Sequence, residues 1–241
     1  MNSKLKNAEE FESHLISLFH ELRSANDHFH FVNCLYQALS DYEREIQQSP
    51  AFWGKTIDAH VSAMWSYLCR VYDDHPAAVH LLFLLETVRD KPDIFCKTAF
   101  KQRLGQAEGC DDLVDKFGDP DKGKVEEYIS FCRDPNPLVG GLREWRHNVV
   151  AHLNKRVSTD VEQFKQQWPF EQKDIQELIN KGYEMLKMCA ESYDSRQLSL
   201  NLPSNNDYKF VFESIRLNLS NRDERDNLLL KAISKQTPTT L

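Results

Sequence analysis

The chain has few residues that interrupt helices, with 8 glycines and 9 prolines among its 241 residues. This scarcity disfavours a sheet-rich fold with many tight turns and favours long helices. The sequence also lacks an apolar run that approaches the length of a membrane span, and its first ten residues lack the apolar core of a secretory signal. We therefore expect a helical protein without a membrane contact, and a cytoplasmic location.

The six cysteines form no CxxC pair, which argues against a thiolate metal site or a redox motif. A disulfide scaffold is not expected in a chain of this size without a secretory signal. Several of the cysteines occur in apolar helical patterns, where cysteine usually packs as a small hydrophobic residue. The expected role of these thiols is therefore structural.

Motifs for the common cofactors are missing as well. The sequence contains no P-loop, no GxGxxG and no nucleophile elbow, so an ATPase, a dehydrogenase and an α/β-hydrolase all lack support. His28 and His30 diverge at helical spacing, and Asp73-Asp74 before His75-Pro76 is better explained as a helix stop and N-cap than as a magnesium pair. Arg70 and Asp73, three residues apart, are expected to pair. We expect no metal and no cofactor.

The formal net charge is −7, which argues against a general nucleic-acid coat protein because such proteins need a broad basic face. A local basic site on an acidic body remains compatible with this charge. Any nucleic-acid function must therefore depend on a small cluster of residues.

Apolar residues recur at helical spacing through most of the chain. Residues 7–48 are expected to form one long helix or two in series, and further long helices are expected over about residues 50–72 and 172–196. A leucine-rich helix should follow Pro76, and shorter helices should lie between residues 90 and 134. Residues 208–212 are compatible with a strand or a helix start, and residues 222–234 with a helix. The pattern predicts an all-α bundle of long antiparallel helices, with a helical domain over residues 1–200 and a partly helical C-terminal extension over residues 201–241 whose end is disordered.

The segment Leu142–Asn154 concentrates the residues that can do chemistry. Asn136-Pro137 predicts the start of its helix. At about 100° per residue, Arg146 and His152 flank an apolar stripe that contains Val149. Because the arginine side chain is long, the two polar ends could converge on one anion above that stripe. Asn148 lies on the same side as His152, whereas His147 points more nearly away.

A neutral imidazole can take a proton from a ribose 2′-hydroxyl or give one to a leaving oxygen. A guanidinium can grip the phosphate and stabilise the charge that develops on it. Arg146 and His152 therefore suit metal-independent RNA cleavage, with His147 or Asn148 as an orienting group. Arg143, Lys155 and Arg156 could bind the RNA backbone, although Lys155 and Arg156 also suit the negative C-terminal end of a helix.

The run Arg146-His147-x-x-x-x-His152 resembles the R-polar-x(4–6)-H signature of HEPN domains. Trp145 before it and Ala151-His152-Leu153-Asn154 after it are similar to the abortive-infection and toxin-like branch of that family. Trp53 and the run Arg70-x-Tyr72-Asp73 are also similar to that branch. The resemblance covers about residues 10–195 and leaves the C-terminal tail outside.

The resemblance implies a helical bundle that forms a homodimer with the motif helices facing each other. It further implies a composite cleft for RNA, in which Arg146 and His152 match the two signature positions and His147 matches the polar position. Proteins of this kind act in phage defence or toxin–antitoxin growth arrest, often with a nucleotidyltransferase-like antitoxin as partner. The expected activity is that of a metal-independent endoribonuclease.

A second interpretation treats the chain as a non-catalytic helical dimer that binds a protein or nucleotide partner in such a system, including the antitoxin side of a pair. In that case Trp145, Val149 and Leu153 would carry the interface energy and His152 would lie at its rim. The substitution His152→Ala separates the two interpretations, because it should abolish activity in the first and leave assembly unchanged in the second.

Overall fold

The computed structural model describes residues 8–105, 110–117, 119–133, 135–150, 161–201 and 207–236. In these ranges the backbone forms helices and connecting segments without a β-strand, which confirms the expected all-α fold. The chain divides into two compact units, one made from residues 1–28 and 62–201 and the other from residues 29–61 and 202–241. No helix in the described ranges is long and apolar enough to cross a membrane.

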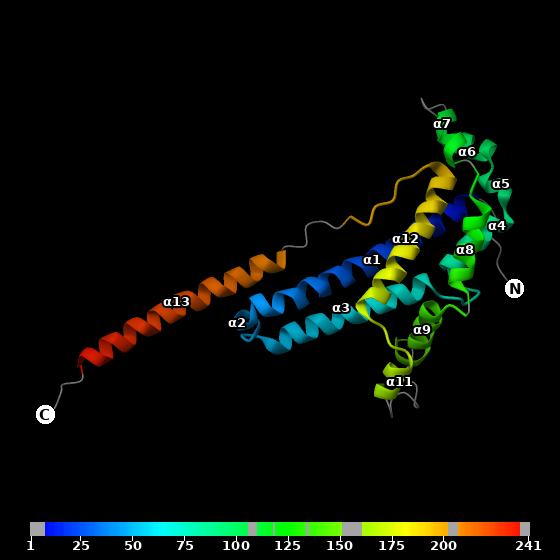
Figure 1. Ribbon diagram of the computed structural model, residues 1–241. Coiled ribbons are helices and arrows are strands. Elements are labelled where there is room, and N and C mark those ends of the chain that lie inside the picture. Colours follow the sequence, from blue (N-terminus) through cyan, green and yellow to red (C-terminus); the bar gives the residue numbers. More distant parts are fainter. Residues whose placement is uncertain are drawn as a thin grey trace. The chain divides into compact units, whose positions relative to one another are not determined.

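Three long helices form the body of the first unit: α1 (Ala8–Asp41), of which residues up to His28 belong here, the second half of α3 (Pro50–Val71), and α12 (Gln172–Asp194). Glu21 pairs with Arg70 at 2.5 Å between Oε2 and Nε, and the rings of His28 and Tyr67 stack 5.6 Å apart. Because the positions on α1 rise as those on α3 fall, these two helices are antiparallel (Figure 1).

The first unit is tightly packed where α1, α3 and α12 meet. A Cβ added at Gly182 would lie 3.1 Å from Cδ1 of Leu22 and 3.2 Å from the hydroxyl of Tyr72, so glycine permits this close approach. The Tyr72 hydroxyl donates to the carbonyl oxygen of Leu178 at 2.6 Å. Tyr72 is almost fully buried, and this bond satisfies its polar end. The end of α3 is thereby fixed to α12.

Short helices occupy the stretch between α3 and the motif segment, as the sequence predicts for residues 90–134. They are α4 (Leu81–Asp90), α5 (Pro92–Phe95), α6 (Lys97–Leu104), α7 (Cys110–Phe117) and α8 (Lys122–Cys132). Helix α4 packs against α8, and α6 packs against α7. Figure 1 shows this group at one end of α12.

The segment between α3 and α4 corrects one expectation from the sequence. Helix α3 ends at Val71, as the Asp73-Asp74 stop predicts, but α4 begins only at Leu81. Its N-cap is His80, whose Nδ1 accepts a hydrogen bond from the Phe83 backbone N–H at 3.1 Å. The prediction that Asp73-Asp74 caps the next helix is therefore wrong, because nine residues of connecting chain separate the two helices.

The second unit consists of the remainder of α1 and α3, the one-turn helix α2 (Glu43–Ile46) and helix α13 (Asp207–Gln236). Its core contains Tyr42, Trp53 and Phe212, with Phe212 stacked on Tyr42 at 4.8 Å. Residues 208–212, for which the sequence left strand and helix open, belong to α13. Arg216 on α13 pairs with the buried Glu45 of α2 at 2.7 Å, which adds a charged contact beside this core.

Candidate functional site

The motif helix starts where the sequence predicts. Helix α9 (Pro137–Trp145) has Asn136 as its N-cap, and the Asn136 side chain accepts hydrogen bonds from the backbone N–H groups of Leu138 and Val139. Proline occupies the first turn, where its missing N–H costs nothing. Cap and proline together fix the start of the segment that carries Arg143 and Arg146.

The motif itself is not a regular α-helix. After Trp145 the backbone continues as the π-helical segment η1 (Arg146–Val150). A π-helix bonds residue i to residue i+5, so each residue turns through a smaller angle than in an α-helix. The expected placement of Arg146, Asn148 and His152 around Val149 assumed α-helical geometry and is wrong for Arg146–Val150. Single π-turns inside helices occur frequently at functional sites, and here the π-turn begins at the motif arginine.

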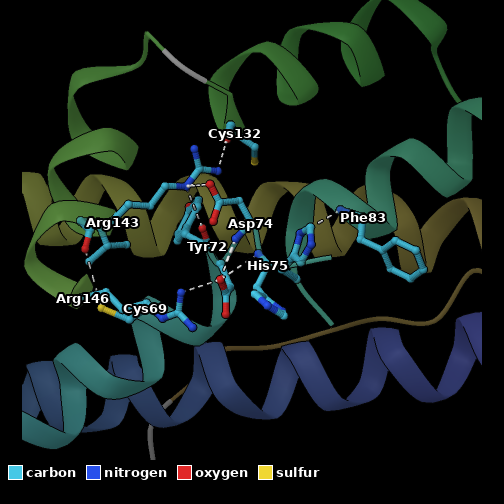
Figure 2. Close-up of polar contacts among 11 residues, drawn as sticks. Cys69, Tyr72, Asp74, His75, Phe83, Cys132, Arg143 and Arg146 are labelled. Atoms are coloured by element: carbon cyan, nitrogen blue, oxygen red, sulfur yellow. Dashed lines mark hydrogen bonds and ion pairs between the residues drawn. The ribbon is translucent and has the colours of Figure 1, made fainter. Parts of the chain in front are cut away.

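Arg146 is held by a buried carboxylate. Its Nη1 donates to Oδ1 of Asp73 at 2.8 Å, and the side chains are 26% and 5% exposed, respectively. The same Asp73 oxygen accepts the backbone N–H groups of Asp74 at 2.8 Å and His75 at 3.0 Å. Figure 2 shows Arg143 and Arg146 extending toward the segment of Tyr72, Asp74 and His75. The expected pair between Asp73 and Arg70 is wrong, because Arg70 turns to Glu21 on α1.

Arg143 lies about one helical turn before Arg146, and its side chain is mostly buried. Its Nη2 donates to the Cys132 carbonyl oxygen at 2.8 Å, and its Nε lies 3.4 Å from Oδ2 of Asp74 (Figure 2). The side chain is only 11% exposed. The guanidinium thus ties the motif helix to the end of α8, a structural contact that the sequence did not predict. Its expected role in binding substrate stays a prediction.

The two polar residues after Arg146 differ in their surroundings. His147 is exposed, and its expected role as the polar residue of the motif stays a prediction. The side-chain amide of Asn148 donates to the backbone oxygen of Glu144 at 2.9 Å and to its carboxylate Oε2 at 3.0 Å. Asn148 therefore extends back along its own helix, and its expected role as an orienting group stays a prediction.

An aromatic cluster supports the motif helix at the junction of α9 and η1. Trp145 stacks on Trp65 with ring centroids 5.3 Å apart and an interplanar angle of 13°, and it meets Phe164 of α11 (Val161–Gln167) edge to face. The Trp145 indole Nε1–H donates to the Trp168 carbonyl oxygen at 2.9 Å. Phe170 packs edge to face on Trp65. The backbone just before Arg146 is thereby fixed from several sides.

His152, Lys155 and Arg156 lie outside the described residues, so the structure leaves their expected roles as predictions. Leu153 lies outside them too. The described part of the motif therefore consists of Arg143 through Val150. In that part, the guanidinium groups of Arg143 and Arg146 are both held, and the Arg146 side chain is the more exposed of the two, at 26% against 11%.

Burial favours the neutral forms of two groups near the site, Cys69 and His80. Burial raises the pKa of the Cys69 thiol to about 12, although the charge of Arg146 acts in the opposite direction. Cys69 is therefore a protonated thiol and no nucleophile at neutral pH. Burial also lowers the pKa of His80, against the opposing influence of Asp73 and Asp74. In the described ranges, no three His, Cys, Asp or Glu residues gather in a way that could hold a metal ion.

Sequence reasoning missed Asp73 and Asp74 as partners of the motif arginines. One signal was available: two adjacent aspartates follow one helix, and two arginines three residues apart lie on another. Two residues three positions apart on a helix lie on the same face, so the guanidinium groups of Arg143 and Arg146 can both reach one acidic segment. The pairing itself depends on how α9 packs against the end of α3, which the local pattern does not encode.

The described helices and the absence of strands among them are consistent with the all-α bundle that the sequence resemblance implied. A family model described as AbiU2 (HEPN_AbiU2) matches residues 8–209. Since this match covers most of the chain, the chain belongs to that family of HEPN-type abortive-infection proteins, as the resemblance implied. No curated protein and no solved structure matches the chain significantly.

Proposed function

We propose that this protein is a metal-independent endoribonuclease that arrests growth in phage defence or in a toxin–antitoxin pair. The observation that carries the proposal is the state of Arg146: it lies at the matched signature position, starts a π-turn and is held by a buried carboxylate. Such a fixed, partly exposed cation suits the recognition of a phosphate. The family assignment supplies the abortive-infection context.

The proposed reaction is attack of a ribose 2′-hydroxyl on the adjacent phosphorus. His152 takes the 2′-hydroxyl proton as the oxygen–phosphorus bond forms, or returns a proton to the 5′-oxygen as its bond to phosphorus breaks. Arg146 stabilises the negative charge that builds on the phosphoryl oxygens. The products are a 2′,3′-cyclic phosphate and a free 5′-hydroxyl. DNA lacks the 2′-hydroxyl and is spared.

The site is proposed to be completed in a homodimer, with the motif segments of two copies facing each other. Two copies would supply two imidazoles, one as base and one as acid, for a reaction that needs both proton transfers. The exposed His147 is available to orient the substrate in such a cleft. A nucleotidyltransferase-like antitoxin is the proposed restraining partner, and the cytoplasm the proposed location.

We assign binding of the RNA sugar–phosphate backbone to the basic residues that flank the motif. Lys155 and Arg156 are proposed to contact phosphates beyond the scissile one, as electrostatic contacts without sequence preference. Arg143 contributes chiefly positive potential, because its guanidinium already donates to the Cys132 carbonyl oxygen. RNA affinity should accordingly weaken as salt increases.

The test is cleavage of end-labelled RNA in EDTA by the purified wild type, Arg146→Ala and His152→Ala. We expect the wild type to cut, Arg146→Ala to lose roughly 10²–10³-fold in rate, and His152→Ala to lose roughly 10²–10⁴-fold. Sedimentation analysis should show the same dimer for all three proteins.

Matched controls are His20→Ala and Arg225→Ala, which remove an exposed histidine of α1 and an exposed arginine of α13. Both should cut at the wild-type rate. Cleavage by His152→Ala at the wild-type rate would contradict the proposed mechanism. Intact RNA with every protein, together with an unchanged dimer, would favour the non-catalytic binding partner instead.

A further inference from the structure

We infer that Asp73 is a positioning residue for Arg146, which orients the guanidinium toward the scissile phosphate. The inference rests on the proposed ribonuclease function and adds to it a residue outside the motif. Asp73 lies in the segment after α3, 73 positions before Arg146. It reaches the guanidinium from a different element, so it can fix a direction that the motif helix alone does not determine.

Asp73 is itself rigidly placed. Its Oδ1 accepts two backbone N–H groups, those of Asp74 and His75, in addition to the Arg146 guanidinium. The preceding residue, Tyr72, is bonded to α12 through its hydroxyl. The hydrogen bonds to the Asp73 carboxylate are charge-assisted, and such bonds are shorter and stronger than neutral ones. A carboxylate held from three directions gives Arg146 an anchor with little freedom to move.

The pairing uses a single N–H donor of the guanidinium. Arginine carries five N–H donors, and the bond to Asp73 uses one of them, on Nη1. Asp73 is the one hydrogen-bond acceptor of this guanidinium in the described part of the chain. The edge formed by Nε and Nη2 can therefore grip two phosphate oxygens while Nη1 stays on Asp73. Orientation of this kind can be worth about 10²-fold in rate, because small misplacements of a catalytic group are costly.

The negative charge of Asp73 has a second effect that makes the role testable. A carboxylate beside Arg146 reduces the local positive potential and so weakens the attraction of a phosphate. Replacing Asp73 by asparagine keeps an oxygen for the two backbone N–H groups, but it removes the charge and turns the charge-assisted bond to Arg146 into a weaker neutral one. Orientation should then deteriorate while attraction of the substrate should not, so kcat should fall without a rise in KM.

Asp74 provides the matched control on the neighbouring residue. Its carboxylate is 45% exposed and lies 3.4 Å from Arg143, a longer and more solvated contact than that of Asp73. Because the Asp74 carboxylate is solvated and its contact is long, it contributes less than the short, buried contact of Asp73. Asp74→Asn removes the same charge from the same segment without touching the Arg146 contact.

The experiment compares the steady-state RNA cleavage of the wild type, Asp73→Asn and Asp74→Asn in EDTA, with thermal unfolding of each. We expect Asp73→Asn to lower kcat roughly tenfold or more with KM unchanged or reduced, and Asp74→Asn to stay within about twofold. Wild-type kcat in folded Asp73→Asn overturns the inference. A drop in activity that only follows the unfolded fraction, with kcat per folded molecule unchanged, overturns it as well.

A second measurement keeps this inference distinct from the proposed function. In ¹⁵N-arginine NMR spectra, a guanidinium whose Nη1 is held should show slow rotation about its Cζ–Nη1 bond. The Arg146 signal is identified by its absence in Arg146→Lys. Separate Nη signals of Arg146 should merge in Asp73→Asn, because the rotation becomes fast, and should persist in Asp74→Asn. Absence of cleavage by the wild type would overturn the proposed function, and this comparison would then decide by itself whether Asp73 orients Arg146. Identical Arg146 signals in the wild type and Asp73→Asn would overturn the inference.

Discussion

Trp145 lies flat on Trp65, with ring centroids 5.3 Å apart and an interplanar angle of 13°. This stack joins the motif helix to α3 directly before the π-turn. Trp145→Ala removes the stack and the hydrogen bond to Trp168, and we expect the free energy of unfolding to fall by about 2–4 kcal/mol. Trp145→Phe keeps an aromatic ring and should cost less, about 1–2 kcal/mol. Urea denaturation followed by circular dichroism measures both. Equal stability of Trp145→Ala and wild type would show that the cluster does not support the motif.

Two glycines in helices should respond in opposite directions to alanine. A Cβ at Gly141 in α9 would lie 3.1 Å from Cε2 of Phe170, a ring itself packed on Trp65, whereas a Cβ at Gly54 in α3 would have no neighbour within 4 Å. Gly54→Ala should stabilise the protein by roughly 0.5–1 kcal/mol. Gly141→Ala should destabilise it by about 1 kcal/mol, because overpacking exceeds the gain in helix propensity. The shift of the urea denaturation midpoint relative to wild type shows whether each variant is stabilised or destabilised. Stabilisation by Gly141→Ala would contradict the packing of Phe170 on α9.

His80 should make stability depend on pH. Burial lowers its pKa in the folded state, so between that value and the unfolded value of about 6.5 the unfolded chain binds more protons. The stabilisation is therefore complete above about pH 6.5 and is lost as the pH falls through this window. His80→Asn keeps a capping side chain for α4 and removes the titration.

The measurement for His80 is the free energy of unfolding at pH 7.5 and pH 5.5. The decrease between these two values should be smaller in His80→Asn than in the wild type. His28, whose pKa is also lowered by burial, contributes equally to both proteins and cancels in the difference. The same pH dependence in both proteins would show that His80 is not buried as a neutral imidazole.

The cysteines should differ in reactivity according to burial. Burial raises the pKa of the Cys69 and Cys132 thiols to about 12, and it raises that of Cys189 as well. Thiolate is the reactive form, so these three should resist iodoacetamide at pH 8 in the folded protein. Cys34 and Cys96 are only partly buried and should be alkylated first. Peptide mass spectrometry over time gives the order, and early labelling of Cys189 would contradict the packing of α12.

The sequence predicted the elements whose signals are local. The Asn136-Pro137 start of α9, the end of α3 before Asp73 and the short helices between residues 90 and 134 all follow from caps, breakers and apolar spacing. The same holds for the all-α class, because glycine and proline are scarce throughout. The resemblance to the family was confirmed by the family match over residues 8–209.

The features that the sequence did not predict depend on tertiary packing. Asp73 follows Arg70 by three residues, just beyond the end of α3, yet Arg70 pairs with Glu21 and Asp73 pairs with Arg146. This choice follows from the antiparallel packing of α1 and α3 and from the approach of α9. The π-turn over Arg146–Val150 likewise has no composition signal in the sequence.

The most direct test of the central claim is the chemical identity of the ends that the protein leaves on RNA in the presence of EDTA. Mass spectrometry of the fragments from a defined oligoribonucleotide gives this in one measurement. The account predicts 2′,3′-cyclic phosphate and 5′-hydroxyl ends, formed with Arg146 and His152 intact and absent when every 2′-hydroxyl is methylated. Cleavage that leaves 3′-hydroxyl and 5′-phosphate ends, or that proceeds equally well on the methylated strand, would contradict it.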